Sequence, residues 1–334
     1  SLTPQFAALL QSEWSLHHTV EHMFLRDEIS DSQLRMMFAC CHPSIPVASQ
    51  VAIMLKTLCG LSAAEIARAF LTGEDTITKR IFRAREKMRT DLKELEVPQG
   101  DALPPRLDAV LQALYLLFNE GYLSSNPDFV IREELCREAM RLCLLLTEHP
   151  QTKFPRTLAL MSLFCFQASR LGTRLDDQGN IILLKYQDRT KWFRPLIQKG
   201  FDYLDASSEP FEISPFQLEA GIASLHAAAP DFAATDWKTI YQLYQLLYNL
   251  RPGPVVAMNK AIAAGYAISP QQGIAELHAI TELNQHYLYH AALGELLNEA
   301  GKKEEALHFF SRALALAQLP AEQALLRQKM EQCG

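Results

Sequence analysis

The sequence has no apolar run that reaches the roughly 20 residues needed for a membrane-spanning helix. Its first residues also lack the basic and then apolar segments of a secretion signal. The seven cysteines are an odd number and show no CxxC spacing, so they do not indicate a disulfide framework. These absences predict a protein of the reducing cytoplasm with no membrane association.

Signatures of catalysis are lacking as well. The sequence contains no nucleophile elbow, no phosphate-binding glycine loop and no motif of paired carboxylates. The run Cys40-Cys41-His42 is the most metal-like segment, but adjacent cysteines do not easily share one tetrahedral ion. We therefore predict no enzyme activity, no cofactor and no metal site.

What the chain does have is enough apolar material for a large core. Of its 334 residues, 49% are hydrophobic, which suits two or more folded domains. The formal net charge of −6 argues against a protein that is basic throughout. Any contact with nucleic acid must therefore come from a local basic patch.

Apolar residues recur three and four positions apart along almost the whole chain, which predicts an all-α fold. We expect a linker or remnant helix at 1–29, a compact helical domain at 30–92 and a larger helical domain at 104–334. The boundary is placed at the Pro98 and Pro104-Pro105 segment, because proline cannot lie inside a continuous helix.

A helix-turn-helix is the sharpest local pattern. It comprises a first helix within 60–70, a turn at 71–75 and a second helix from Thr76. Ser62 followed by Glu65 forms a capping box, which fixes the start of the first helix. In the second helix, one narrow apolar stripe consists of Ile77, Ile81, Ala84 and Met88.

The other side of this second helix is basic. Between residues 75 and 90 there are six basic and two acidic side chains, a local charge of +4 in an acidic protein. Such a helix face can be merely solvated, but the capped helix and turn before it favour DNA recognition. The predicted DNA-binding residues are Thr76, Lys79, Arg80, Arg83 and Lys87.

Several short segments of the sequence resemble the sigma-70 family of RNA polymerase sigma factors. Region 4 of that family is suggested by Gly60-Leu61-Ser62, Glu65-Ile66-Ala67 and the run from Arg80 to Arg85. An extracytoplasmic-function subgroup with a long helical C-terminal extension is suggested by 31–43, 115–122, 187–192 and 235–237.

The resemblance implies that region 4 contacts the upstream (−35) promoter element and the flap of core RNA polymerase. It also implies a non-catalytic role in transcription initiation. Sigma factors carry a region 2 that grips the polymerase and melts the −10 element, and the residues before 30 leave no room for it. We therefore expect region 2 to be missing from this chain.

Near the C-terminus, small and aromatic residues follow the spacing of a tetratricopeptide repeat (TPR). The pattern lies at about 270–317 and includes Gly294, Gly301, Ala306, Phe310 and Ala313. One repeat cannot bury its own faces, so a short TPR-like α-solenoid is expected. Such an extension either binds a protein partner and regulates the chain, or serves only as stabilising bulk.

Two further clusters are candidates for a pocket or an interdomain contact. Asn119 and Glu120 end an apolar helix, where Gly121 alternatively serves as a helix C-cap. Asp188, Arg189 and Trp192 lie within five residues of each other, a pattern more typical of a buried tie between helices than of catalysis.

Two other functions remain open from the sequence. A helix-turn-helix regulator with a ligand-sensing helical domain would bind its operator without polymerase, normally as a dimer. A TPR-like scaffold would not bind DNA at all, and replacement of its basic helix residues would leave its function unchanged.

Overall fold

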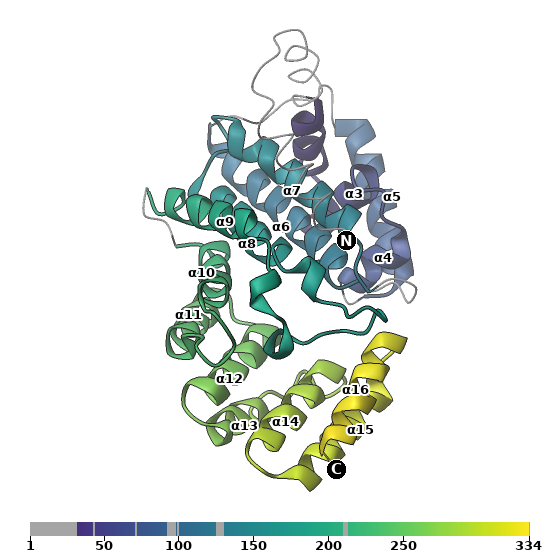
Figure 1. Cartoon of the computed structure of the whole chain (residues 1–334). Coiled ribbons are helices and arrows are strands. Elements are labelled where there is room, and N and C mark those ends of the chain that lie inside the picture. Colours follow the sequence, from purple (N-terminus) through teal and green to yellow (C-terminus); the bar gives the residue numbers. More distant parts are fainter. Residues whose placement is uncertain are drawn as a thin grey trace. The chain divides into compact units, whose positions relative to one another are not determined.

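A computed structural model describes residues 32–42, 44–70, 72–91, 98, 100–124, 130–209 and 213–333. The predicted segment 1–29 lies outside the described residues. The chain divides into two compact units, one ending at Phe164 and the other beginning at Cys165 (Figure 1). The predicted boundary near 92–104 stays a prediction.

The first unit contains a helix at 32–40 and then the elements α3 to α8. Their bounds are α3 (Val47–Thr57), α4 (Ala63–Ala69), α5 (Glu74–Asp91), the short 3-10 turn η1 (Gly100–Ala102), α6 (Leu103–Tyr122), α7 (Glu133–Glu148) and α8 (Pro155–Ala168). Helix α3 packs against α4, α5 and α6, and α6 packs along α7. The helix-turn-helix therefore shares one core with the helices that follow it.

This core is dense and aromatic at its centre. The rings of Phe118 on α6 and Phe164 on α8 stack with centroids 4.3 Å apart, and both side chains are fully buried. Arg106, at the start of α6, donates to the backbone carbonyl of Phe38. That hydrogen bond connects α6 to the helix at 32–40.

The second unit begins with the end of α8 and three 3-10 turns and continues with a series of helices. These are η2 (Leu171–Thr173), η3 (Leu184–Tyr186), η4 (Arg189–Lys191), α9 (Arg194–Ala206), α10 (Pro215–Ala228), α11 (Trp237–Leu250), α12 (Pro254–Ala267), α13 (Pro270–His278), α14 (Tyr287–Glu299), α15 (Lys303–Leu316) and α16 (Pro320–Cys333). From α9 to α16 each helix packs against the next. Among the described residues the only strand-like feature is an isolated bridge between Leu175 and Ile181. The prediction of an all-α fold is confirmed.

The pair α14 and α15 shows the packing that the small residues predict. A Cβ added at Gly294 would lie 2.7 Å from the ring of Phe310, so the glycine lets the two helices approach and the aromatic ring fills the gap. Ala306, Phe310 and Ala313 are all buried in this pair. The contact at Gly294 is confirmed, whereas the TPR-like repeat itself stays a prediction.

Within the part of the chain that the structure describes, none of the helices combines the length and apolar character required to cross a bilayer.

Candidate nucleic-acid interface

Helix α4 begins as its capping signal predicts. The Ser62 hydroxyl accepts a hydrogen bond from the Glu65 backbone N–H at 3.1 Å, and the Glu65 carboxylate accepts one from the Ser62 N–H at 2.7 Å. Both arms of the capping box are present. The start of α4 is thus fixed by residues only three positions apart.

The turn to α5 is made around Gly73. Its carbonyl accepts hydrogen bonds from the N–H groups of Thr76 and Ile77, at 3.1 and 3.3 Å, so it completes the first turn of α5. Ile77, Ile81 and Ala84 are buried, and α5 packs against α3 and α4. The predicted apolar stripe is confirmed for these three residues, while Met88 is half-buried.

The opposite side of α5 carries the predicted DNA-binding residues. Thr76, Lys79, Arg83 and Lys87 are exposed. Lys79 and Arg83 form no ion pair with any other described residue, so their charges are available to an anionic partner. Lys87 instead lies 3.6 Å from the Asp91 carboxylate.

Arg80 differs from its neighbours because it is half-buried. Its guanidinium lies 5.8 Å from the ring centroid of Phe70, which ends α4. This is the distance of a cation–π contact. Arg80 therefore also helps to hold α5 against the end of α4.

Several exposed residues of α5 were not among the predicted set, among them Phe82 and Arg85. Phe82 is 66% exposed. The sequence could have indicated this exposure, because position 82 lies outside the apolar stripe that contains Ile77 and Ile81. Arg85 is exposed too. Since residues two apart in a helix do not share a face, Arg85 and Arg83 point to different sides of α5.

An ion pair joins α4 to the segment before α7. The Arg132 guanidinium pairs with the Glu65 carboxylate and, at 2.9 Å, with Glu134. The pKa of Glu65 is below its usual range: burial raises it, but hydrogen bonds from Ser62 and the charge of Arg132 outweigh that effect. The carboxylate of Glu65 thus serves both the capping box and a tertiary contact.

The two residues predicted to line a pocket near Gly121 do not come together. Glu120 is buried and accepts a hydrogen bond from the Ser124 hydroxyl at 3.2 Å, whereas Asn119 is exposed. The interpretation of Gly121 as a helix C-cap is wrong, because α6 continues to Tyr122. A Cβ at Gly121 would lie 2.7 Å from the backbone N of Cys136, so close packing of α6 on α7 requires glycine here.

In the cluster of Asp188, Arg189 and Trp192, a buried arginine connects several elements. Arg189 is 3% exposed, and it donates to the carbonyls of His226 and Ala229 and to the Thr235 hydroxyl, at 2.7, 3.2 and 3.0 Å. Its guanidinium lies 5.2 Å from the ring centroid of the buried Trp192. These contacts join η4 to the end of α10 and the segment before α11.

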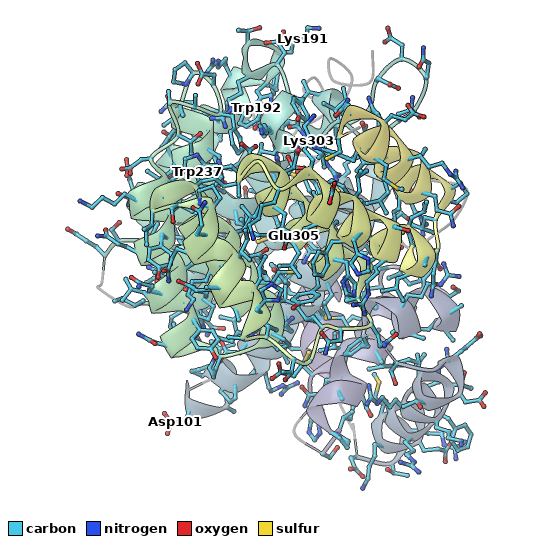
Figure 2. The ribbon with its side chains drawn as sticks, turned by 90° about the horizontal axis from the view of Figure 1, so that it is seen from below. Asp101, Lys191, Trp192, Trp237, Lys303 and Glu305 are labelled. Carbon is cyan, nitrogen blue, oxygen red and sulfur yellow. The ribbon has the colours of Figure 1, made fainter. Side chains whose placement is uncertain are left out.

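The neighbours of Arg189 and Trp192 in the sequence face outward. Asp188 is exposed, and its carboxylate accepts hydrogen bonds from the N–H and hydroxyl of Thr190, which lower its pKa. Lys191 is also exposed and projects outward, whereas Trp192 lies against the helices (Figure 2). Asp188, Arg189 and Trp192 therefore do not converge on a common point.

The segment around Cys40 packs into the core of the first unit. Cys40 and Cys41 are buried, and burial raises the pKa of the Cys40 thiol to about 12. His42 Nδ1 hydrogen-bonds to the Ser44 hydroxyl at 2.8 Å. Among the described residues no group of three or more His, Cys, Asp or Glu is arranged to hold a metal ion.

Comparison with known proteins gives two family matches and a curated relative. Residues 35–88 match the family described as Sigma-70, region 4, and residues 106–208 match a family of unknown function, DUF6596. An uncharacterized protein of Rhizobium meliloti (strain 1021) is 37% identical over 303 residues, which cover 90% of this chain and 71% of the relative. No solved structure matches significantly.

Proposed function

Because this chain belongs to the same family as the Rhizobium meliloti protein and carries a sigma-70 region 4 domain, we propose that it is a promoter-recognising sigma factor of bacterial RNA polymerase. In this proposal residues 30–92 bind the −35 element and core polymerase in the cytoplasm. The helices of 104–334 regulate this activity or bind a protein partner. The chain itself performs no catalysis.

The observation that carries the proposal is the exposed basic side of α5. A helix-turn-helix places the N-terminal part of its second helix in the major groove, where side chains meet base edges. Thr76 and Lys79 occupy that part of α5, and both are exposed. Arg83 follows one turn later, where a cation meets a backbone phosphate.

A direct test measures binding to DNA and to core RNA polymerase separately. Anisotropy with a labelled duplex, at several salt concentrations, reports DNA binding by the chain alone and in complex with core polymerase. Each phosphate contact contributes about 0.9 to the slope of log affinity against log salt. Because only Arg83 is assigned to a phosphate, the double variant K79A/R83A is expected to lower the slope by about 1. The lost base contact of Lys79 should lower the affinity further at every salt concentration.

The matched control is Arg85→Ala, which removes another exposed cation from a different side of the same helix. It is expected to leave the slope unchanged. Equal losses in R85A and K79A/R83A would contradict the assigned face. Tight binding to one operator by a dimer without polymerase would favour a conventional regulator, and no binding to core polymerase would refute the sigma-factor role.

A further inference from the structure

After its first turn, where Lys238 is exposed, the outer side of α11 carries no charge. Between Lys238 and Arg251 the sequence has twelve consecutive residues without an acidic or basic side chain. Gln242, Gln245 and Asn249 are nevertheless exposed. A solvent-facing helix side normally carries charged residues, whereas depletion of charge is characteristic of the centre of protein interfaces.

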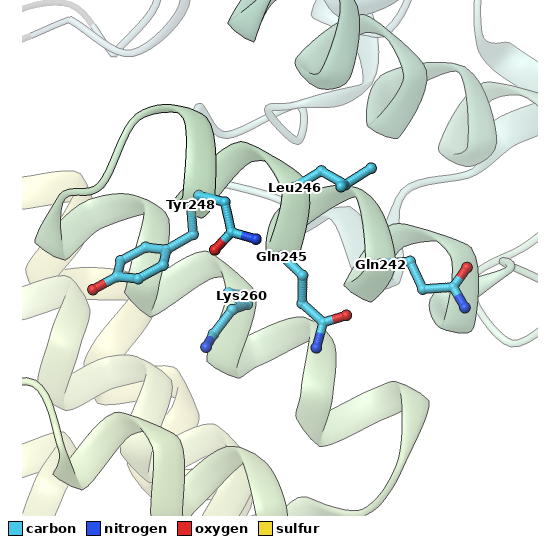
Figure 3. A pocket seen from close by; sticks show the side chains of 6 residues that line it. Gln242, Gln245, Leu246, Tyr248 and Lys260 are labelled. Carbon is cyan, nitrogen blue, oxygen red and sulfur yellow. The ribbon is translucent and has the colours of Figure 1, made fainter. Parts of the chain in front are cut away.

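These residues line a shallow groove. Side chains from α11 and one from α12 surround a volume of about 760 Å³: Gln242, Gln245, Leu246, Tyr248, Asn249 and Lys260. In Figure 3, Gln245 of α11 and Lys260 of α12 project in the same direction. Leu246 is 51% exposed, so the groove also offers apolar surface.

The charge of Lys260 is compensated within the unit. Its ammonium lies 3.2 Å from the Glu276 carboxylate of α13 and 5.3 Å from the ring centroid of Tyr248. The Tyr241 hydroxyl donates to the same carboxylate at 2.9 Å, and Gln245 hydrogen-bonds to Tyr241. The groove is therefore close to neutral, and the positions of its side chains are held by this network.

The amides follow a regular spacing. Gln242, Gln245 and Asn249 lie at positions i, i+3 and i+7, which places them on one side of α11 over about 10 Å. An extended chain covers this length with about three residues. Each amide both donates and accepts hydrogen bonds, as the backbone of an extended peptide requires, whereas a helical ligand has already satisfied its own backbone.

We propose that this groove binds an extended, uncharged polypeptide segment, with its backbone on the amides of α11 and an aliphatic side chain against Leu246. The inference rests on the part of the proposed function that assigns a protein partner to the C-terminal helices. It names the surface and the chemistry of that partner.

The test uses the full chain and fluorescent capped octapeptides that alternate leucine and serine. One peptide is unmodified, a second is methylated on alternate backbone nitrogens, a third has glutamate for serine, and a fourth is an alanine-rich helix former. The unmodified peptide is expected to bind at least tenfold more tightly than the other three. Equal binding of the methylated peptide, tighter binding of the acidic or helical one, or no binding at all would overturn the proposal.

Variants locate the binding site. The double change Gln242→Leu and Asn249→Leu is expected to weaken binding of the unmodified peptide at least tenfold. The control Gln328→Leu, at an exposed amide of α16, should leave the affinity for this peptide unchanged. Circular dichroism establishes that each variant is folded. DNA affinity of the same samples is measured in parallel, so that loss of peptide binding is distinguished from failure of the DNA-binding role.

Discussion

The Glu65 carboxylate has two roles, the capping box with Ser62 and the ion pair with Arg132, and two substitutions should separate their contributions to stability. Glu65→Gln keeps an acceptor for the Ser62 N–H, because glutamine also completes a capping box, but it removes the charge that faces Arg132. Glu65→Ala removes both interactions. Comparison of the two variants therefore assigns a free energy to each.

The burial of the pair sets the expected magnitude. The side chains of Arg132 and Glu65 are 20% and 17% exposed, between the surface pairs that contribute up to about 1 kcal/mol and the buried pairs whose disruption costs about 3–5 kcal/mol. We expect E65Q to cost about 1–2 kcal/mol. E65A should cost about 1 kcal/mol more, the usual net contribution of a hydrogen bond, because it also loses the bond from the Ser62 N–H.

Hydrogen exchange of the α4 amides is the suitable assay, because it reports the opening of this segment rather than the unfolding of both units. In a double-mutant cycle, Arg132→Gln should cost somewhat more than E65Q, because it also loses the pair with Glu134, and the double variant should cost hardly more than Arg132→Gln alone. Additive costs in the double variant, or exchange of E65Q equal to that of the wild type, would refute the reasoning.

The same pair has a defined pH dependence. Since the pKa of Glu65 is lowered in the folded protein, its stabilisation is fully present above the ordinary glutamate pKa of about 4.3. That stabilisation is lost as the pH falls through the lowered pKa of the folded state. The difference between the wild type and E65Q should therefore disappear in acid, and its persistence there would show that a contact other than charge is involved.

Two further predictions concern stability. Gly121→Ala should destabilise the first unit by about 1–3 kcal/mol, because the added Cβ meets backbone atoms. The control Gly221→Ala in α10, whose Cβ has only a 3.4 Å contact to Leu243, should be neutral or stabilising by up to about 1 kcal/mol, and urea unfolding followed by circular dichroism measures both variants. Arg189→Met should destabilise the second unit by about 2–4 kcal/mol, because three acceptors lose their donor, and an unchanged urea midpoint would contradict this role.

Local signals account for what the sequence predicted correctly. The capping box of Ser62 and Glu65 and the stripe of Ile77 and Ile81 depend on residues three or four apart, so one helix turn determines them. The contact between Gly294 and Phe310 followed from a repeat pattern that specifies both partners.

Contacts between distant residues could not be predicted in this way. Arg132 is 67 positions from Glu65, and no local pattern connects them. The misinterpretation of Gly121 has the same origin: its surroundings in sequence suit a helix C-cap, and only the backbone of Cys136 explains why α6 continues through it. The neutral groove did leave a signal, the long uncharged run of α11, but its meaning depended on knowing which side is exposed.

The family matches and the compact units divide the chain at different places. The DUF6596 match, residues 106–208, begins at Arg106, which donates to Phe38, and it continues past the end of the first unit at Phe164. Its first part therefore completes the core around the region 4 match: α6 packs on α3, and the ion pair with Glu65 comes from the segment before α7. Because region 4 shares a core with this segment, a structural shift of α6 or α7 is transmitted to the helix-turn-helix through directly packed side chains.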